Sequence, residues 1–177
     1  MVKVRVAGVA LDAAGQHVIL LKPVDELAGS GSVLPIWIGE QEATSILIAI
    51  EGAHVPRPLA HDLMRNLVEA VDAEVQRVEV TRLDGGTFYA EVTLSTPRGD
   101  RVVDARPSDA VALASRVGAP IWVDDAVMAE ASVLDTVIEH SDEDDVPEAE
   151  EVAAVDVAES IDEFKRFIDD VDPEDFR

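Results

Sequence analysis

The chain has 177 residues, of which 47% are hydrophobic and 4% aromatic, and its formal net charge at pH 7 is −23. This length suits one ordinary domain rather than two, with a core built mainly from Val, Ile, Leu and Ala. The sequence contains no cysteine, which excludes disulfides and thiolate metal sites. Its N-terminus alternates Val with Lys3 and Arg5, so we expect no signal peptide. No window of the sequence approaches the ~18 continuous apolar residues of a membrane span, so we expect no such span and a cytoplasmic location.

The negative charge is distributed unevenly. Residues 1–138 carry 11 Lys and Arg against 20 Asp and Glu, a net charge of −9. Residues 139–177 carry 3 against 17, a net charge of −14. Because proteins bind phosphate backbones through Lys and Arg that release counterions, this balance argues against tight, passive binding of nucleic acid.

The N-terminal part of the chain alternates apolar and polar residues in the way typical of strands. A strand at 2–6 and a second at 16–21 are predicted to form a hairpin across the turn at 12–15. A Gly- and Ser-containing loop at 24–32 follows, and then a third strand at 33–38.

Two helices are predicted next. The first opens at 39–42 and ends at Gly52, a natural helix stop. The second spans 59–71, and its apolar residues form one stripe: Leu63, Leu67, Ala70 and Val71.

The second half of the domain returns to strands. Clean alternation predicts a hairpin of strands joined by a two-glycine turn, a further strand, a helix opened by a proline, a short strand and a short helix. These elements are expected at 74–82, 87–95, 100–105, 108–117, 120–123 and 124–130.

The sequence therefore predicts a single α/β (α+β) domain over residues 1–138, with a largely antiparallel sheet and three to four packed helices. Residues 139–159 are predicted to be an acidic, disordered linker. Residues 160–177 begin with a capping-box pattern and are predicted to form a short amphipathic helix and tail. Such a short helix is marginal alone, so we expect it to dock on its own domain or on a protein partner.

Polar residues gather at three element ends. The first group is Glu40 and Glu42, which could hold a divalent ion or simply complement the dipole of the helix they open. The second is His61 and Asp62, where His61 is a candidate general base and Asp62 could orient it or bind a metal. The alternative for this pair is a surface histidine beside a first-turn acid.

The third group is the densest, at residues 104–109. Asp104 ends a strand, Arg106 can fork onto a carboxylate or a phosphate, and Ser108 and Asp109 open a helix whose amides favour anions. The structural alternative is an Arg–Asp network that fixes the corner between strand and helix.

At these groups the sequence resembles the bifunctional nuclease (BFN) domain family, and its bacterial members in particular. The resemblance rests on an ordered set of stretches: LPIWIGEQEATSILIAIEG (34–52), RPLAHDLMRNLVEAV (57–71), VEVTRLDGGTFYAEVTL (78–94) and DARPSDAVALASRVGAPIWV (104–123). The tail segment EFKRFIDDVDPEDF (163–176) is similar to the C-terminal end of bacterial members. Ala60 departs from the Thr frequent in the family, which removes an expected N-cap hydroxyl.

The resemblance implies a mixed sheet, a homodimer and nuclease activity on RNA and DNA. In a metal-dependent version, Mg²⁺ or Mn²⁺ would be held by Glu40, Glu42, Asp62, Asp104 and Asp109. Arg106 would stabilise charge on the phosphate, and His61 would activate water or protonate the leaving oxygen.

Two other functions fit the residues. The acidic charge favours a non-enzymatic, homodimeric binding or regulatory module whose tail helix docks on a partner. A sensor of a small anionic ligand or nucleotide is the third alternative, with Arg106 and the helix start at Ser108 as the binding site.

Overall fold

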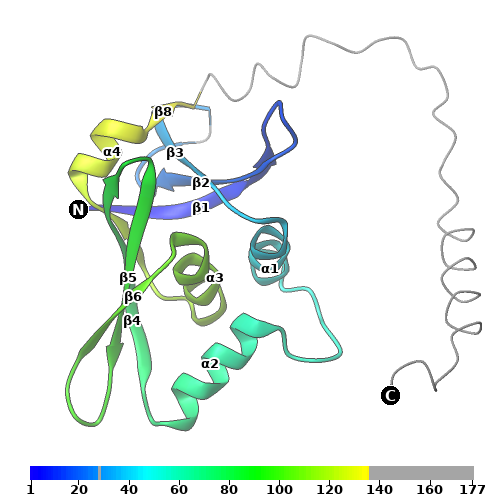
Figure 1. Ribbon diagram of the computed structural model, residues 1–177, viewed down its shortest axis with the longest axis vertical. Coiled ribbons are helices and arrows are strands. Elements are labelled where there is room, and N and C mark those ends of the chain that lie inside the picture. The colour runs from blue at the N-terminus through cyan, green and yellow to red at the C-terminus, as the bar shows by residue number, and fades with distance from the viewer. Residues whose placement is uncertain (28, 136–177) are drawn as a thin grey trace, which may run out of the picture. The chain divides into compact units, whose positions relative to one another are not determined.

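The computed structural model describes residues 1–27 and 29–135. In this part of the chain, one mixed and mostly antiparallel sheet of eight strands packs with four helices (Figure 1). The predicted fold class is therefore confirmed. The linker and C-terminal helix predicted at 139–177 lie outside the described residues, and the domain boundary at 138 stays a prediction.

Eight strands form the sheet in the described residues. They are β1 (Val2–Leu11), β2 (His17–Pro23), β3 (Ser32–Trp37), β4 (Glu74–Asp84), β5 (Thr87–Ser95), β6 (Arg101–Ala105), β7 (Ile121–Val123) and β8 (Val133–Leu134). Alternation in burial is clearest in the middle of β4, whereas β2 is mostly buried and β6 mostly exposed. Their order in the sheet is β6-β5-β4-β7-β1-β2-β3-β8. The pairing of β4 with β7 is parallel and the other pairings of described strands are antiparallel. β8 was not predicted, because two residues are too few to show a period of two.

The helices begin and end close to the predicted positions. They are α1 (Glu40–Glu51), α2 (Ala60–Ala70), α3 (Pro107–Val117) and α4 (Asp125–Ala131). Gly52 and Gly118 end α1 and α3 with φ of 62° and 70°, the left-handed conformation that glycine adopts without strain. The N-cap of α2 is Leu59, so the predicted loss of an N-cap hydroxyl at Ala60 is wrong: residue 60 is already the first helical position.

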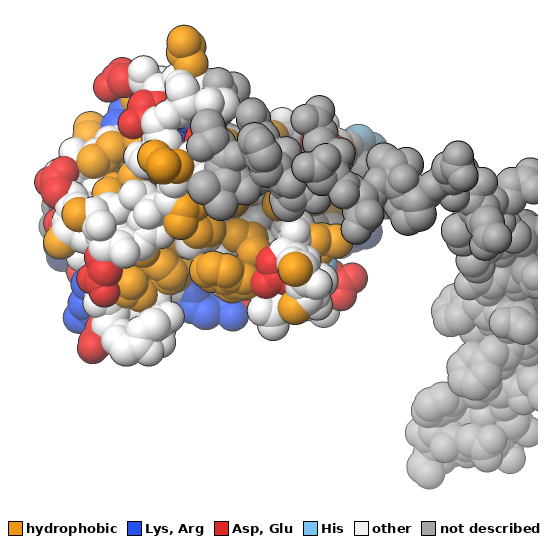
Figure 2. All heavy atoms as spheres, turned by 90° about the horizontal axis from the view of Figure 1, so that it is seen from above, with side chains coloured by type: hydrophobic (Ala, Val, Ile, Leu, Met, Phe, Trp, Pro, Cys, Tyr) orange, Lys and Arg blue, Asp and Glu red, His pale blue; other side chains and the backbone are white. Residues whose placement is uncertain are grey.

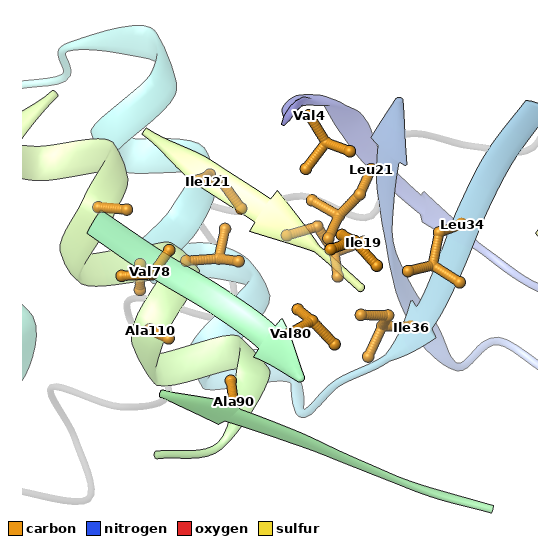
Figure 3. Close-up of a cluster of buried hydrophobic side chains, with 14 of the residues drawn as sticks. Val4, Ile19, Leu21, Leu34, Ile36, Val78, Val80, Ala90, Ala110 and Ile121 are labelled. Atoms are coloured by element: carbon orange, nitrogen blue, oxygen red, sulfur yellow. The ribbon is translucent and has the colours of Figure 1, made fainter. Parts of the chain in front are cut away.

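The core lies between the sheet and the helices and consists of small and branched aliphatic side chains. Val78 and Val80 of β4 stand beside Ile121 and Val123 of β7 in parallel register, and Ala110 of α3 packs against them (Figure 3). α4 contacts both β3 and β4, which three strands separate in the sheet order. The sheet must therefore curve around the core, because one helix reaches both strands.

α2 differs from the other helices in what it buries. Its single buried residue is His61, whereas the side chains of the predicted apolar stripe face solvent. Leu63, Leu67 and Val71 are 54%, 58% and 66% exposed. The stripe is present in the sequence, but within the described residues nothing covers it.

The surface carries both apolar and charged side chains. Figure 2, which views the molecule from above relative to Figure 1, shows apolar side chains in the middle of this face and acidic ones mostly around its rim. None of the helices in the described ranges is long and apolar enough to cross a membrane. The predicted cytoplasmic location stays a prediction.

Candidate functional site

Three helices meet around a small polar cluster. α1 contributes Ser45, α2 contributes His61, and α3 contributes Asp109 and Arg116. Ser45 and His61 are polar residues, yet each is only 6% exposed. Because buried polar groups cost free energy unless they are hydrogen-bonded, the bonds of this cluster determine what it can do.

Ser45, His61 and Asp109 form a hydrogen-bonded chain. Arg116 Nη2 donates to Ser45 Oγ over 2.9 Å, so the hydroxyl is left with its own hydrogen to donate. His61 Nδ1 lies 2.8 Å from this oxygen, and His61 Nε2 lies 3.2 Å from Asp109 Oδ1. A carboxylate accepts only, so Nε2 carries the hydrogen and Nδ1 accepts from Ser45.

Arg106 closes the other side of Asp109. Its Nε donates to Asp109 Oδ2 over 2.9 Å, and its Nη2 donates to Glu42 Oε1 over 2.8 Å. The Arg106 side chain is 67% exposed, and its Nη1 has no protein acceptor within the described residues. Arg106 therefore keeps a charged donor group directed to solvent at the edge of the cluster.

A second ion pair holds the three helices together. Arg116 Nε donates to Asp62 Oδ1 over 2.7 Å, and the side chains are only 4% and 17% exposed. Asp62 Oδ2 also accepts from the amide of Leu59 over 2.9 Å, which fixes the start of α2. Arg116 thus places Ser45 and, through Asp62, the helix that carries His61.

The carboxylates of the cluster remain ionised. Burial raises the pKa of Asp109, but hydrogen bonds from Arg106 and His61 and the charge of Arg106 outweigh it and hold this pKa below its ordinary value. Burial likewise raises the pKa of Asp62, and the Leu59 amide and Arg116 bring it below its ordinary value. The hydrogen bond to Asp109 raises the pKa of Arg106. At neutral pH the site therefore presents Asp109 as an anion and Arg106 as a cation.

Two pockets open beside the cluster and share one residue. The first measures about 710 Å³ and contains Ser45, His61, Asp109 and Glu42 in its wall. The second measures about 530 Å³ and lies between the start of β2, the end of β3 and the turn before β5. Arg106 lines both pockets. A ligand held by Arg106 would therefore reach both spaces.

The structure brings together some of the predicted site residues and separates others. His61, Arg106 and Asp109 meet in the cluster, with Glu42 attached through Arg106. Within the described ranges, the remaining predicted residues make no side-chain hydrogen bond with His61, although Glu40 lines the same 710 Å³ pocket. Asp62 faces Arg116, Ser108 is buried in the first turn of α3 and lines the 530 Å³ pocket, Glu40 is exposed at the start of α1, and Asp104 is exposed on β6 opposite Glu91.

This arrangement gives the predicted metal site no support. Glu42 and Asp109 both bind the Arg106 guanidinium, and Asp62 binds Arg116, so their oxygens are already engaged with cations. Among the residues that the structure describes, no three His, Asp or Glu side chains are grouped so that they could hold a metal ion. Magnesium and manganese prefer several converging oxygen ligands. The donor set does not fit such an ion, and no step is assigned to one.

Two residues of the cluster were not identified from the sequence. Ser45 lies in the run ATSILIAI, three positions after Glu42, and Arg116 lies near the end of α3, seven positions after Asp109. The one available signal was the placement of a hydroxyl and a guanidinium on helix faces that are otherwise apolar. Such a signal becomes specific only when the packing of α1 against α3 is known.

The fold and this polar cluster define a compact α/β domain with a Ser–His–Asp chain at the junction of three helices. The bifunctional nuclease domain family matches residues 19–136, and the chain belongs to this family. An uncharacterized protein of Mycobacterium tuberculosis is 39% identical over 178 residues, which cover 100% of this chain and 99% of that protein. The predicted family is therefore confirmed.

Plant relatives match the domain part only. Bifunctional nuclease 1 of rice (Oryza sativa subsp. indica) is 30% identical over 115 residues, 63% of this chain and 34% of the rice protein. Bifunctional nuclease 2 of Arabidopsis thaliana is 33% identical over 113 residues, 62% of this chain and 33% of that protein. The match is thus to one third of each plant nuclease.

Proposed function

We propose that this protein is a nuclease that hydrolyses phosphodiester bonds of RNA and DNA, with Ser45 as nucleophile and His61 as general base. The observation that carries the proposal is the Ser45–His61–Asp109 chain, with 2.8 Å and 3.2 Å between its partners, in the wall of a pocket. A nucleophile bonded to a base that a carboxylate orients is the arrangement of covalent catalysis. Membership of the family and the names of its plant relatives supply the substrate class.

The chemical steps follow from the hydrogen bonds. His61 Nδ1 takes the proton of Ser45 Oγ as the oxygen bonds to phosphorus, and Asp109 stabilises the imidazolium that forms. The ester P–O bond breaks and the leaving oxygen takes that proton from His61. Water then attacks the phosphorus of the phosphoserine ester and gives its proton to His61. The bond between Ser45 Oγ and phosphorus breaks, and Ser45 Oγ takes this proton back from His61. No 2′-hydroxyl takes part, which suits both RNA and DNA.

Arg106 supplies the positive charge that a phosphodiester needs in an acidic protein. Its exposed guanidinium, ionised beside Asp109 and Glu42, offers Nη1 to a phosphate oxygen. Charge develops on the non-bridging oxygens in the transition state, where a preorganised donor is most effective. The net negative charge of the protein repels the phosphate backbone, which favours brief contact with the substrate over tight binding.

The test is cleavage of labelled single-stranded RNA and DNA in buffer containing EDTA. We expect wild type to cleave both, and Ser45→Ala and His61→Ala to be slower by at least about 10²-fold. His54→Ala is the matched control, because His54 is exposed and outside the cluster, and it should cleave like wild type. Equal cleavage by all four proteins would indicate a contaminant, and loss of wild-type cleavage in EDTA would contradict the metal-free mechanism.

A second candidate is a non-enzymatic, homodimeric binding module, and the exposed stripe of α2 favours it. Leu63, Leu67 and Val71 expose more than half of their side chains along one helix, as at a face that a second copy covers. Size-exclusion chromatography with light scattering would test the dimer. Wild type should elute as a dimer and Leu67→Glu as a monomer. A monomeric wild type would remove this candidate, and a dimer without cleavage would favour it over the nuclease.

A further inference from the structure

The 530 Å³ pocket beside Arg106 has an unusual lining for this protein. It contains Trp37 and Phe88, two of the four aromatic residues in the described ranges. It also contains Arg106 and His17 but no carboxylate, although the chain carries 37 Asp and Glu. The pocket is therefore partly apolar, has two aromatic side chains and no acidic side chain among its described lining residues, and includes the guanidinium assigned to the phosphate.

Trp37 is held in place although it is 55% exposed. Its Nε1 donates to Asp12 Oδ2 over 2.8 Å, and the other oxygen of Asp12 accepts from the amides of Ala14 and Gln16 over 2.9 Å each. The turn between β1 and β2 thus fixes an exposed indole. Fixing a large aromatic side chain at the surface before a ligand arrives lowers the entropy cost of binding.

From this pocket we infer the substrate subsite: it binds a nucleobase of single-stranded nucleic acid against Trp37, while Arg106 binds the adjoining phosphate. The inference rests on the proposed nuclease function. Aromatic faces stack on bases of any sequence, and Arg contributes a charge beside them. Because Arg106 also lines the pocket of Ser45 and His61, a base held here places its phosphate at the catalytic cluster.

The same geometry selects against duplex substrates. A base in a double helix is stacked on both faces and paired at its edge, so it cannot enter a pocket unless it leaves the stack. A single strand presents its bases without that cost. We therefore expect preference for single-stranded RNA and DNA, without strong sequence preference.

The experiment measures binding separately from cleavage. In His61→Ala/Trp122→Phe protein, Trp37 is the one remaining tryptophan, and its fluorescence is titrated with a single-stranded oligonucleotide. An abasic oligonucleotide of the same length, which keeps the phosphates, is the matched ligand. We expect quenching by the first and little quenching by the second, with affinities that differ roughly 5- to 150-fold, the range of one base stack. Equal quenching and affinity would overturn the inference.

Variants of Trp37 provide the second arm. Binding followed by the anisotropy of a labelled strand should weaken roughly 5- to 150-fold in Trp37→Leu and little in Trp37→Phe. Tyr89→Leu is the control, because Tyr89 neighbours Phe88 on β5, points to the other face and stacks under Arg82 at 3.7 Å. Unchanged affinity in Trp37→Leu would refute the subsite.

The two proposals fail in different ways. Cleavage that is normal in wild type and unaffected by Trp37→Leu, with no change in KM, would refute the nucleobase subsite and leave the nuclease intact. Base-dependent quenching of Trp37 without cleavage by wild type would refute the nuclease and leave the binding site. Circular dichroism of each variant identifies loss of fold, and the abasic comparison does not require any change to Trp37.

Discussion

Asp109 serves two partners at once, and this dual role decides the chemistry of the site. One oxygen accepts from His61 Nε2 and the other from Arg106 Nε. The carboxylate thereby selects the tautomer of His61 and orients the guanidinium. The residues from 104 to 109 were recognised as a polar group from sequence, but the role of each could not be assigned, because it depends on which helix faces Asp109. Asp62 was the candidate carboxylate to orient His61, yet the carboxylate that contacts His61 comes from 48 positions further along the chain.

The first prediction concerns this carboxylate. Asp109→Asn keeps the shape but no longer stabilises an imidazolium or fixes the His61 tautomer, so kcat should fall about 10²- to 10⁴-fold with the fold retained. Steady-state kinetics on a single-stranded oligonucleotide would measure it. Asp104→Asn makes the contrast, because Asp104 is exposed on β6 and should leave kcat unchanged. A strong decrease of kcat in Asp104→Asn would favour the metal site predicted from the resemblance.

A second prediction concerns the ion pair of Arg116 and Asp62. Arg116→Met would leave the partly buried Asp62 carboxylate without its cation and Ser45 without its donor, and we expect the free energy of unfolding to fall by about 1–3 kcal/mol. Urea denaturation would measure this difference. The double variant Arg116→Met/Asp62→Leu removes both charges and should recover part of the loss, whereas an equal or larger loss would contradict the assignment.

At the scale of elements, local pattern was sufficient for most of the fold. The period-two strands, the two-glycine turn between β4 and β5, and the glycines that end α1 and α3 could be predicted because each depends on backbone conformation over a few residues. Which face of α2 is buried could not be predicted from the sequence. Its stripe of Leu63, Leu67 and Val71 has helical spacing, but spacing alone does not tell whether the covering surface belongs to the same chain.

This difference between helices gives a third prediction. Ile46 on α1 is 0% exposed in the core, so Ile46→Ala should lower the free energy of unfolding by about 2–5 kcal/mol. Leu67 on α2 is 58% exposed, so Leu67→Ala in a monomeric sample should change it by less than about 0.5 kcal/mol. Thermal or urea unfolding of the two variants at equal protein concentration would compare them. If Leu67→Ala lowered the free energy of unfolding by more than this, and the decrease depended on protein concentration, the result would indicate a dimer.

At the scale of the whole molecule, a protein of net charge −23 uses three of its described cations to neutralise partly buried carboxylates. Arg106 binds Asp109, Arg116 binds Asp62, and the buried Lys22 binds Asp135. The hydrogen bond from Lys22 holds the pKa of Asp135 below its ordinary value despite burial. Two of these ion pairs, Arg116–Asp62 and Lys22–Asp135, join segments that are distant in sequence. Composition therefore predicts the net charge but not which cation pairs with which carboxylate.

The pH dependence of stability is the fourth prediction. Asp62, Asp109 and Asp135 have folded-state pKa values below the ordinary 3.8, so their contribution is fully present above that pH and is lost as pH falls through the folded values. From pH 7 to 4, protonation of exposed acids reduces self-repulsion and should keep stability level or raise it. Below 3.8 the free energy of unfolding should fall. A continued rise towards pH 2.5 in urea titrations would contradict these ion pairs.

The most direct test of the account is the stereochemical course at phosphorus. Hydrolysis of a single-stranded phosphorothioate of one configuration in H₂¹⁸O would distinguish the two routes, because each in-line displacement inverts the phosphorus centre. Attack by Ser45 followed by water comprises two displacements and predicts net retention. Net inversion would show that water attacks directly and would contradict Ser45 as the nucleophile.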